Sequence, residues 1–219
     1  MFVDLIEYVV VVFIGLLPIA NPFSTAPLFI GLTSDRTEAA RHKIATRACL
    51  NMAAILLVFL IAGSLVLSFF GITINGLRVA GGMIIGFIGF RMLFPPPASN
   101  ADVVEQHHGD GPDIAFTPLA VPMLSGPGSI AVIIGMSAEV AAREIGSDRI
   151  WGYFSVGLGI ILTALACWLV LRASGTVLRF FGASGIDALT RIMGFFLICI
   201  GVEFVAGGVS GFAEALISG

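Results

Sequence analysis

The chain has 219 residues, of which 58% are hydrophobic and 11% are charged, and its mean hydropathy is +1.04. Soluble domains carry about 25% charged residues, so this composition excludes an ordinary soluble domain and predicts an integral membrane protein. The net charge of −3 says little about partners, because what matters in a membrane protein is where each charge lies relative to the membrane. We expect the lipid bilayer, and no nucleic acid, as a partner.

Uncharged stretches predict six membrane spans, each needing roughly 20 mostly apolar residues. The first stretch lies between Glu7 and Asp35, and the mixed-charge run 35–47 after it is predicted to be a solvated turn. The remaining spans are predicted near 48–70, 73–94, 113–138, 150–171 and 187–209.

A polar linker divides these spans into two groups of three. Residues 95–112 begin with three prolines, which stop a helix, so the chain is predicted to form a repeat at 1–94, a linker at 95–112 and a repeat at 113–219. Three spans reverse the direction of the chain, which makes the two repeats inverted relative to each other. The predicted fold is therefore an all-α membrane protein of six transmembrane helices in two inverted three-helix repeats.

Arginine and lysine positions predict the orientation. Three connections on one side carry eight basic residues, and the other side carries three. The richer set is Arg36, Arg41, Lys43, Arg47, Arg91, Arg172, Arg179 and Arg191; the poorer set is Arg78, Arg143 and Arg149. The positive-inside rule places the richer side in the cytoplasm and both termini in the periplasm.

A ten-residue segment at 18–27 returns one hundred positions later, at 118–127. Four positions are identical in the two copies: Pro18/Pro118, Ala20/Ala120, Pro22/Pro122 and Pro27/Pro127. Prolines this close interrupt a helix, and irregular backbone at membrane depth is tolerated only beside protein or a water-filled cavity. Interrupted helices at matching places in two halves are typical of a transporter binding site. Two alternatives stay open: the prolines only kink packed helices, or residues 113–138 form a re-entrant hairpin.

A helix that restarts after each interruption offers unpaired amides and the positive end of its dipole to an anion such as a carboxylate. We expect Thr25 and Ser125 to cap these restarts, with Pro27 and Pro127 in the first turns. Carbonyls freed by the prolines near Asn21–Pro22 and near Val121–Pro122 are expected to meet an ammonium group. The candidate substrate-binding residues are Asn21, Pro22, Ser24, Thr25, Val121, Pro122, Ser125, Gly126, Gly128 and Ser129.

Charged residues inside spans are further candidates. Glu203 in the last span is a candidate for H⁺ or Na⁺ coupling, or else a hydrated residue at the outer interface. Arg78 and Arg191 are expected to mark span ends by extending toward the interface.

Other features favour structural roles. His107 and His108 lack the spacing of a zinc site and belong to the polar linker, so no metal is expected. The glycines of the third span favour close helix packing; they are Gly81, Gly82, Gly86 and Gly89. The three cysteines lie in apolar runs and are read as packing residues. No catalytic motif or nucleotide-binding loop is present, so we expect neither an enzyme nor a cofactor.

Two stretches resemble signatures of a known family. Residues 21–33, Asn-Pro-Phe-Ser-Thr-Ala-Pro-Leu-Phe-Ile-Gly-Leu-Thr, resemble the first signature of the MarC family of bacterial inner-membrane proteins, and residues 118–130 resemble the second. Arg191-Ile-Met-Gly194 also fits, and the resemblance covers the whole chain. Ser24 departs from a glycine usual near this position, which would narrow or re-tune a pocket.

The resemblance implies a multi-pass protein of the bacterial inner membrane, similar to six-span neutral amino acid transporters and distantly to LysE-type exporters. It implies small neutral amino acids, which are zwitterions, as substrates. We therefore expect a secondary transporter, an exporter or exchanger, that works by alternating access on an ion gradient. A passive channel or facilitator for small polar solutes is the alternative, and a homo-oligomer is left open.

Overall fold

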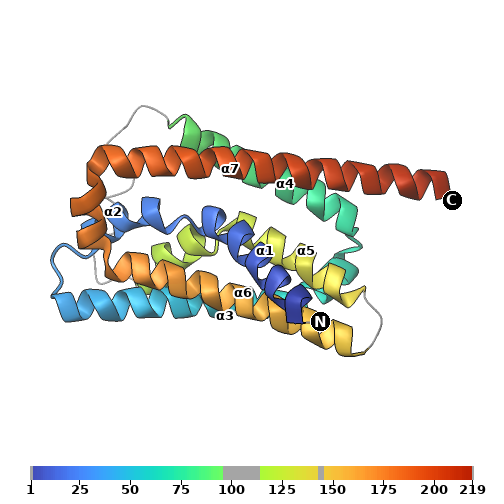
Figure 1. Cartoon of the computed structure of the whole chain (residues 1–219), viewed down its shortest axis with the longest axis horizontal. Helices are drawn as coiled ribbons and strands as arrows, with labels where there is room; N and C mark the ends of the chain where they lie inside the picture. The colour runs from blue at the N-terminus through green and yellow to red at the C-terminus, as the bar shows by residue number, and fades with distance from the viewer. Residues whose placement is uncertain (1, 96–113, 143–145, 219) are drawn as a thin grey trace.

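The structure is a computed structural model that describes residues 2–95, 114–142 and 146–218 (Figure 1). The regular structure of these residues is entirely helical. The first half forms α1 (Phe2–Ala20), α2 (Pro22–Leu32), α3 (Glu38–Phe70) and α4 (Ile74–Leu93). The second half forms the π-type helix η2 (Ala115–Leu124), α5 (Pro127–Ala141), α6 (Ser147–Arg172) and α7 (Ser174–Ser218).

Four of the described helices, α3, α4, α6 and α7, are long and apolar enough to cross a membrane. A fifth candidate is the pair α1 and α2, whose axes differ by 44° across the break at Asn21. α5 has 15 residues, fewer than the roughly 20 that a span requires. The structure thus confirms an all-α protein with four to five candidate spans among the described residues, whereas the six-span inverted repeat stays a prediction.

Two helices extend beyond the predicted spans. α3 begins at Glu38, within the run predicted to be a solvated turn, because Thr37 caps it and accepts a hydrogen bond from the Ala40 amide at 3.3 Å. Glu38 and His42, one turn apart, add a contact of 3.7 Å between a carboxylate oxygen and an imidazole nitrogen, which suits a helix in water. α7 begins at Ser174 and bends at Gly182, whose φ of 64° only glycine adopts readily. The predicted linker lies outside the described residues beyond Pro95.

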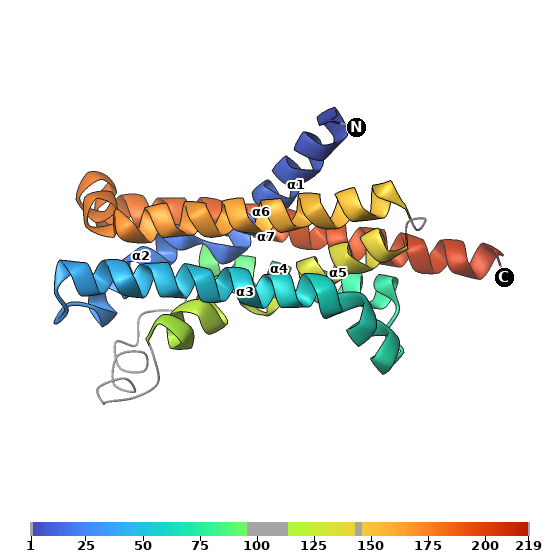
Figure 2. The same cartoon turned by 90° about the horizontal axis from the view of Figure 1, so that it is seen from below.

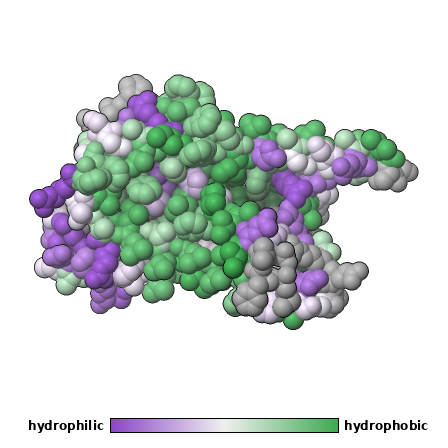
Figure 3. Space-filling view, viewed as in Figure 1, coloured by the Kyte–Doolittle hydropathy of each residue, from purple (hydrophilic) through white to green (hydrophobic). Residues whose placement is uncertain are grey.

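The connections between helices gather at the two ends of the bundle. Figures 1 and 2 show the α2–α3 turn and the α6–α7 junction at one end, and the C-terminus at the other. Apolar side chains cover the middle of the bundle, and hydrophilic ones gather at the end with the α2–α3 turn and again toward the opposite end (Figure 3). This distribution fits a protein embedded in a bilayer, and Arg36 and Arg172 share the end that the sequence assigns to the cytoplasm. Which side that end faces stays a prediction.

The interior of the bundle is apolar. Val12 of α1, Met52 of α3, Leu119 of η2, Ile133 of α5 and Ile160 of α6 are completely buried in one cluster. This cluster includes residues of α1 and η2 next to the two breaks, so both breaks border packed protein.

α4 and α7 pack in direct backbone contact along a row of glycines. A Cβ atom built on Gly82 would lie 2.6 Å from the Gly201 carbonyl oxygen, and one built on Gly89 would lie 2.6 Å from that of Gly194. Because the residue numbers rise in one helix as they fall in the other, the two helices run antiparallel. The predicted packing role is confirmed for these glycines of α4, whereas a Cβ on Gly86 meets no atom within 4 Å.

Candidate functional site

The first break falls at Asn21, between α1 and α2. Its φ of 36° and ψ of 66° are left-handed. Pro22 has no amide hydrogen and disfavours helical geometry in the residue before it. Asparagine tolerates the left-handed region better than other non-glycine residues. The local sequence therefore dictates where the helix is interrupted.

The hydroxyls after this break are held by its own backbone. The Asn21 carbonyl accepts hydrogen bonds from Thr25 Oγ1 at 3.1 Å and from Ser24 Oγ at 3.3 Å. The Asn21 side chain caps α2 by accepting a bond from the Ser24 amide at 3.4 Å, and its Nδ2 lies 3.8 Å from Met92 Sδ. The predicted cap at Thr25 is wrong, because Asn21 and Pro22 start the helix earlier and leave Pro27 inside it.

The second break consists of η2 and the residues that follow it. Thr117 and Val121 have extended backbone angles inside η2, with φ near −125° for Val121. Each directly precedes a proline, which explains the geometry. α5 follows η2 directly in the chain, and whether the two form an interrupted span or a re-entrant hairpin stays open.

α5 restarts at Pro127, as expected, but without a side-chain cap. Gly126 occupies the N-cap position, and Ser125 Oγ donates instead to the Ala120 carbonyl at 2.6 Å. The predicted capping role of Ser125 is therefore wrong. The cause is the π-type turn, which leaves that carbonyl within reach of the hydroxyl.

The two breaks are neighbours in the folded chain. A Cβ built on Gly128 would lie 3.2 Å from Ile19 Cγ2, so the start of α5 packs against the end of α1. The interrupted segments run in opposite directions, since α2 leads toward the α2–α3 turn and α5 leads away from that end (Figure 1). Two helix beginnings of opposite orientation thus share one interior region.

Most of the predicted site residues are buried there. Buried residues are Asn21, Pro22, Thr25, Ser125, Gly128 and Ser129, and half-buried ones are Ser24, Val121 and Gly126. Pro122 lies in η2. Among the described residues, every buried side-chain nitrogen and oxygen has a hydrogen-bond partner. The region is therefore closed and internally bonded in this conformation, and the hydrated cavity expected around it stays a prediction.

The other candidates lie apart from this region or outside the described residues. Glu203 is exposed on α7, whereas Thr25 and Ser125 at the breaks are buried. Arg191 bonds Asp187 at 2.9 Å on its own helix. His107 and His108 fall outside the described residues. Within the described ranges, no group of three or more His, Cys, Asp or Glu side chains is arranged to hold a metal.

One charged pair was missed by the sequence reasoning. Arg78 of α4, expected only to mark a span end, forms an ion pair and hydrogen bond with Glu139 of α5, both partly buried. The pair joins the first half of the chain to the second. A signal existed, because Glu139 is the only charged residue in the apolar stretch 114–142 and such residues usually have a partner.

Comparison with known proteins identifies the family. The sequence profile described as MarC family integral membrane protein matches residues 6–213. The chain is 40% identical over 212 residues to the UPF0056 inner membrane protein MarC of Escherichia coli (strain K12) and to the protein of the same name from Shigella flexneri, covering 94% of this chain and 96% of each relative. No solved structure matches significantly. The chain therefore belongs to the MarC family of multi-pass inner-membrane proteins.

Proposed function

We propose that this protein is a secondary transporter, an exporter or exchanger of small neutral amino acids that works by alternating access. The observation that carries the proposal is the meeting of two oppositely directed helix beginnings in the interior, each next to a proline-induced break. Helix beginnings offer amide hydrogens to a carboxylate. Carbonyls that lose their partners to proline offer acceptors to an ammonium group.

The start of α5 is the better carboxylate site of the two. Pro127 has no amide hydrogen, and no side chain caps the helix, so the amides of Gly128 and Ser129 are those presented at its first turn. The Pro18 carbonyl lacks its usual helical partner, because residue 22 is a proline. Ile19 packs over Gly128 in this conformation, so a substrate enters only if α1 and α5 separate, and little room remains for a large side chain.

The contacts between helices are consistent with two structurally equivalent repeats. The helices of the first half are paired here in chain order with those of the second, so that α2 corresponds to α5, α3 to α6 and α4 to α7. α3 packs on α5, and correspondingly α6 packs on α2. α4 also packs on α5, and correspondingly α7 packs on α2. α3 also contacts η2 as α6 contacts α1. This pairing is what two repeats related by a twofold axis in the membrane plane require, and rocking one repeat against the other is the usual motion of such transporters.

Uptake of radiolabelled amino acids into proteoliposomes tests the proposal. Purified protein is reconstituted with an imposed H⁺ or Na⁺ gradient and given glycine, alanine and a set of larger amino acids. Accumulation of a small neutral amino acid above its outside concentration supports the carrier. Uptake that only equilibrates supports the facilitator instead, and no movement of any solute in either direction overturns both.

Two matched pairs of variants connect transport to the breaks. Gly128→Ala adds a methyl group against Ile19, whereas Gly135→Ala on the same helix meets nothing closer than 3.9 Å. Thr25→Val removes a hydroxyl at the break, whereas Thr163→Val removes an equally buried hydroxyl that bonds its own helix in α6. We expect about three- to tenfold slower transport for Thr25→Val, the effect of one lost hydrogen bond. We also expect slower transport for Gly128→Ala, because the added methyl group crowds the start of α5, and little change for the second variant of each pair. Equal effects within both pairs contradict the assigned site.

A further inference from the structure

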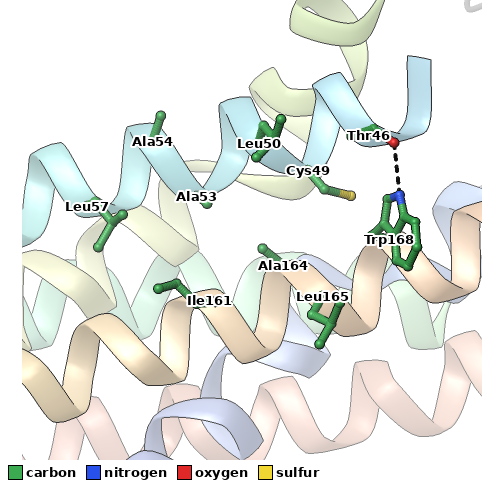
Figure 4. A pocket seen from close by; sticks show the side chains of 10 residues that line it. All are labelled: Thr46, Cys49, Leu50, Ala53, Ala54, Leu57, Ile161, Ala164, Leu165 and Trp168. Atoms are coloured by element: carbon green, nitrogen blue, oxygen red, sulfur yellow. Dashed lines mark hydrogen bonds between the residues drawn. The ribbon is translucent and has the colours of Figure 1, made fainter. Parts of the chain in front are cut away.

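An apolar groove runs between α3 and α6 on the surface of the bundle. Its volume is about 530 Å³. Its only polar side chains besides the Cys49 thiol are Thr46 and Trp168, and these bond each other, with Trp168 Nε1 donating to Thr46 Oγ1 at 3.0 Å (Figure 4). The groove therefore presents mainly carbon atoms. Its lining residues are Thr46, Cys49, Leu50, Ala53, Ala54, Leu57, Ile161, Ala164, Leu165 and Trp168.

This groove faces the space that the bilayer fills. α3 and α6 are both candidate membrane spans. Along the groove Leu50 is 63% exposed and Leu165 is 48% exposed. Exposed leucines on spanning helices contact lipid chains, so a hydrocarbon chain is the natural occupant of a groove between them.

A basic pocket adjoins one end of the groove. Arg172 lies with Cζ 5.2 Å from the centre of the Trp168 ring, so it stands one helical turn beyond the groove on α6. On α3, His42 stands one turn beyond Thr46, and its backbone carbonyl accepts a hydrogen bond from the Thr46 hydroxyl at 2.9 Å. Arg172, His42 and Arg41 line this second pocket of about 240 Å³.

The charges of this pocket favour an anion. Arg41 donates to the Thr33 carbonyl at 2.8 Å and to the Ser34 carbonyl at 3.2 Å, which holds its guanidinium at the pocket while leaving it charged. One carboxylate also lines the pocket, that of Glu38, but it is 88% exposed to solvent. Two arginines therefore outweigh it.

We propose that the groove and the pocket together bind one anionic phospholipid, with an acyl chain along the groove and the phosphate beside Arg172 and Arg41. Basic pockets between helices at the cytoplasmic side are a known form of headgroup recognition, and this end is the one that the sequence assigns to the cytoplasm. A second copy of the chain on the same face is disfavoured. Two copies inserted in the same direction and related by a twofold axis bring their basic ends to the same depth, where like charges repel.

Lipid binding to the purified full-length protein tests the proposal. Native mass spectrometry measures the occupancy of added phosphatidylglycerol and phosphatidylcholine of equal chain length. We expect tighter binding of phosphatidylglycerol, and a loss of about fivefold in its affinity in Arg172→Gln, the effect of one basic residue near an anionic headgroup. Arg179→Gln, an equal loss of charge at an exposed residue outside both pockets, is expected to change it little.

The groove is tested separately from the headgroup. Ala54→Phe fills the groove from an exposed position, and Val58→Phe adds the same ring one turn along α3 at a residue that does not line it. We expect only Ala54→Phe to lower lipid occupancy. Equal binding of the two lipids, or equal losses in Arg172→Gln and Arg179→Gln, overturns the proposal. A wild-type dimer that Ala54→Phe converts to a monomer without a change in lipid occupancy assigns the face to a second copy instead.

Discussion

Replacing Gly201 with alanine places a methyl group inside the backbone contact between α7 and α4. The new Cβ would lie 2.6 Å from the Gly82 carbonyl oxygen and 2.7 Å from the Gly86 amide nitrogen. Both are backbone atoms that cannot rotate away, so the helices must separate, and overpacking of this kind costs about 1–3 kcal/mol. Alanine recovers roughly 0.5–1 kcal/mol through its helix propensity. The expected net loss is about 0.5–2 kcal/mol, or roughly 1–8 °C in melting temperature.

Two glycines beside the contact supply matched controls. A Cβ on Gly207 of α7 or on Gly86 of α4 meets no atom within 4 Å, so alanine there is expected to keep or slightly raise stability. Unfolding in detergent, followed by the fluorescence of the two tryptophans, measures all three variants under one condition. If Gly201→Ala has the same melting temperature as Gly207→Ala, then the helices do not meet at these glycines and the antiparallel register of α4 and α7 is wrong.

Three further outcomes are expected. Asn21→Ala should lower stability by about 1–3 kcal/mol, because it removes the cap of α2 and a residue that tolerates φ of 36°; Asn21→Gly should lower it less, and the reverse order in thermal unfolding contradicts a left-handed break. Arg78→Gln and Glu139→Gln should each destabilise by roughly 1–2 kcal/mol, since each leaves a partly buried charge unpaired; a double-mutant cycle without coupling refutes the ion pair. In a cysteine-free background, Asp35→Cys should react with an impermeant maleimide only from the cytoplasm, and Ser147→Cys only from the periplasm. Labelling of each thiol from the opposite side would mean that the orientation is inverted.

The breaks could be located from sequence because their cause is local. Pro22 acts on Asn21, and Pro118 and Pro122 act on Thr117 and Val121, through the clash of each proline ring with the residue before it. No tertiary contact is needed to place these interruptions, so they lie where the prolines predicted them. The π-type turn of η2 has no comparable signal in the sequence, and with it the true partner of Ser125 went unrecognised.

What sequence reasoning missed lies either in local features that hydropathy does not register or in contacts between distant segments. Hydropathy predicted that the second span begins near residue 48, but the helix already begins at Glu38. The part of a helix that lies outside the bilayer is stabilised by caps and side-chain pairs, which hydropathy does not register. The role of Glu139 became evident only in the folded chain, where it pairs with Arg78. The pairing of Gly82 with Gly201, rather than with another small residue, needed the register of two helices that no span boundary specifies.

The contact between α4 and α7 also bears on how the protein is made. The two helices leave the ribosome far apart in time, with the linker and the whole of η2, α5 and α6 synthesised between them. Until α7 inserts, the glycine face of α4 has only lipid tails against it, and these cannot follow its backbone as closely as another helix does. The amino-terminal half is therefore expected to wait, incompletely assembled, for the last helix of the chain, so that the two halves mature as one cooperative unit and not in succession.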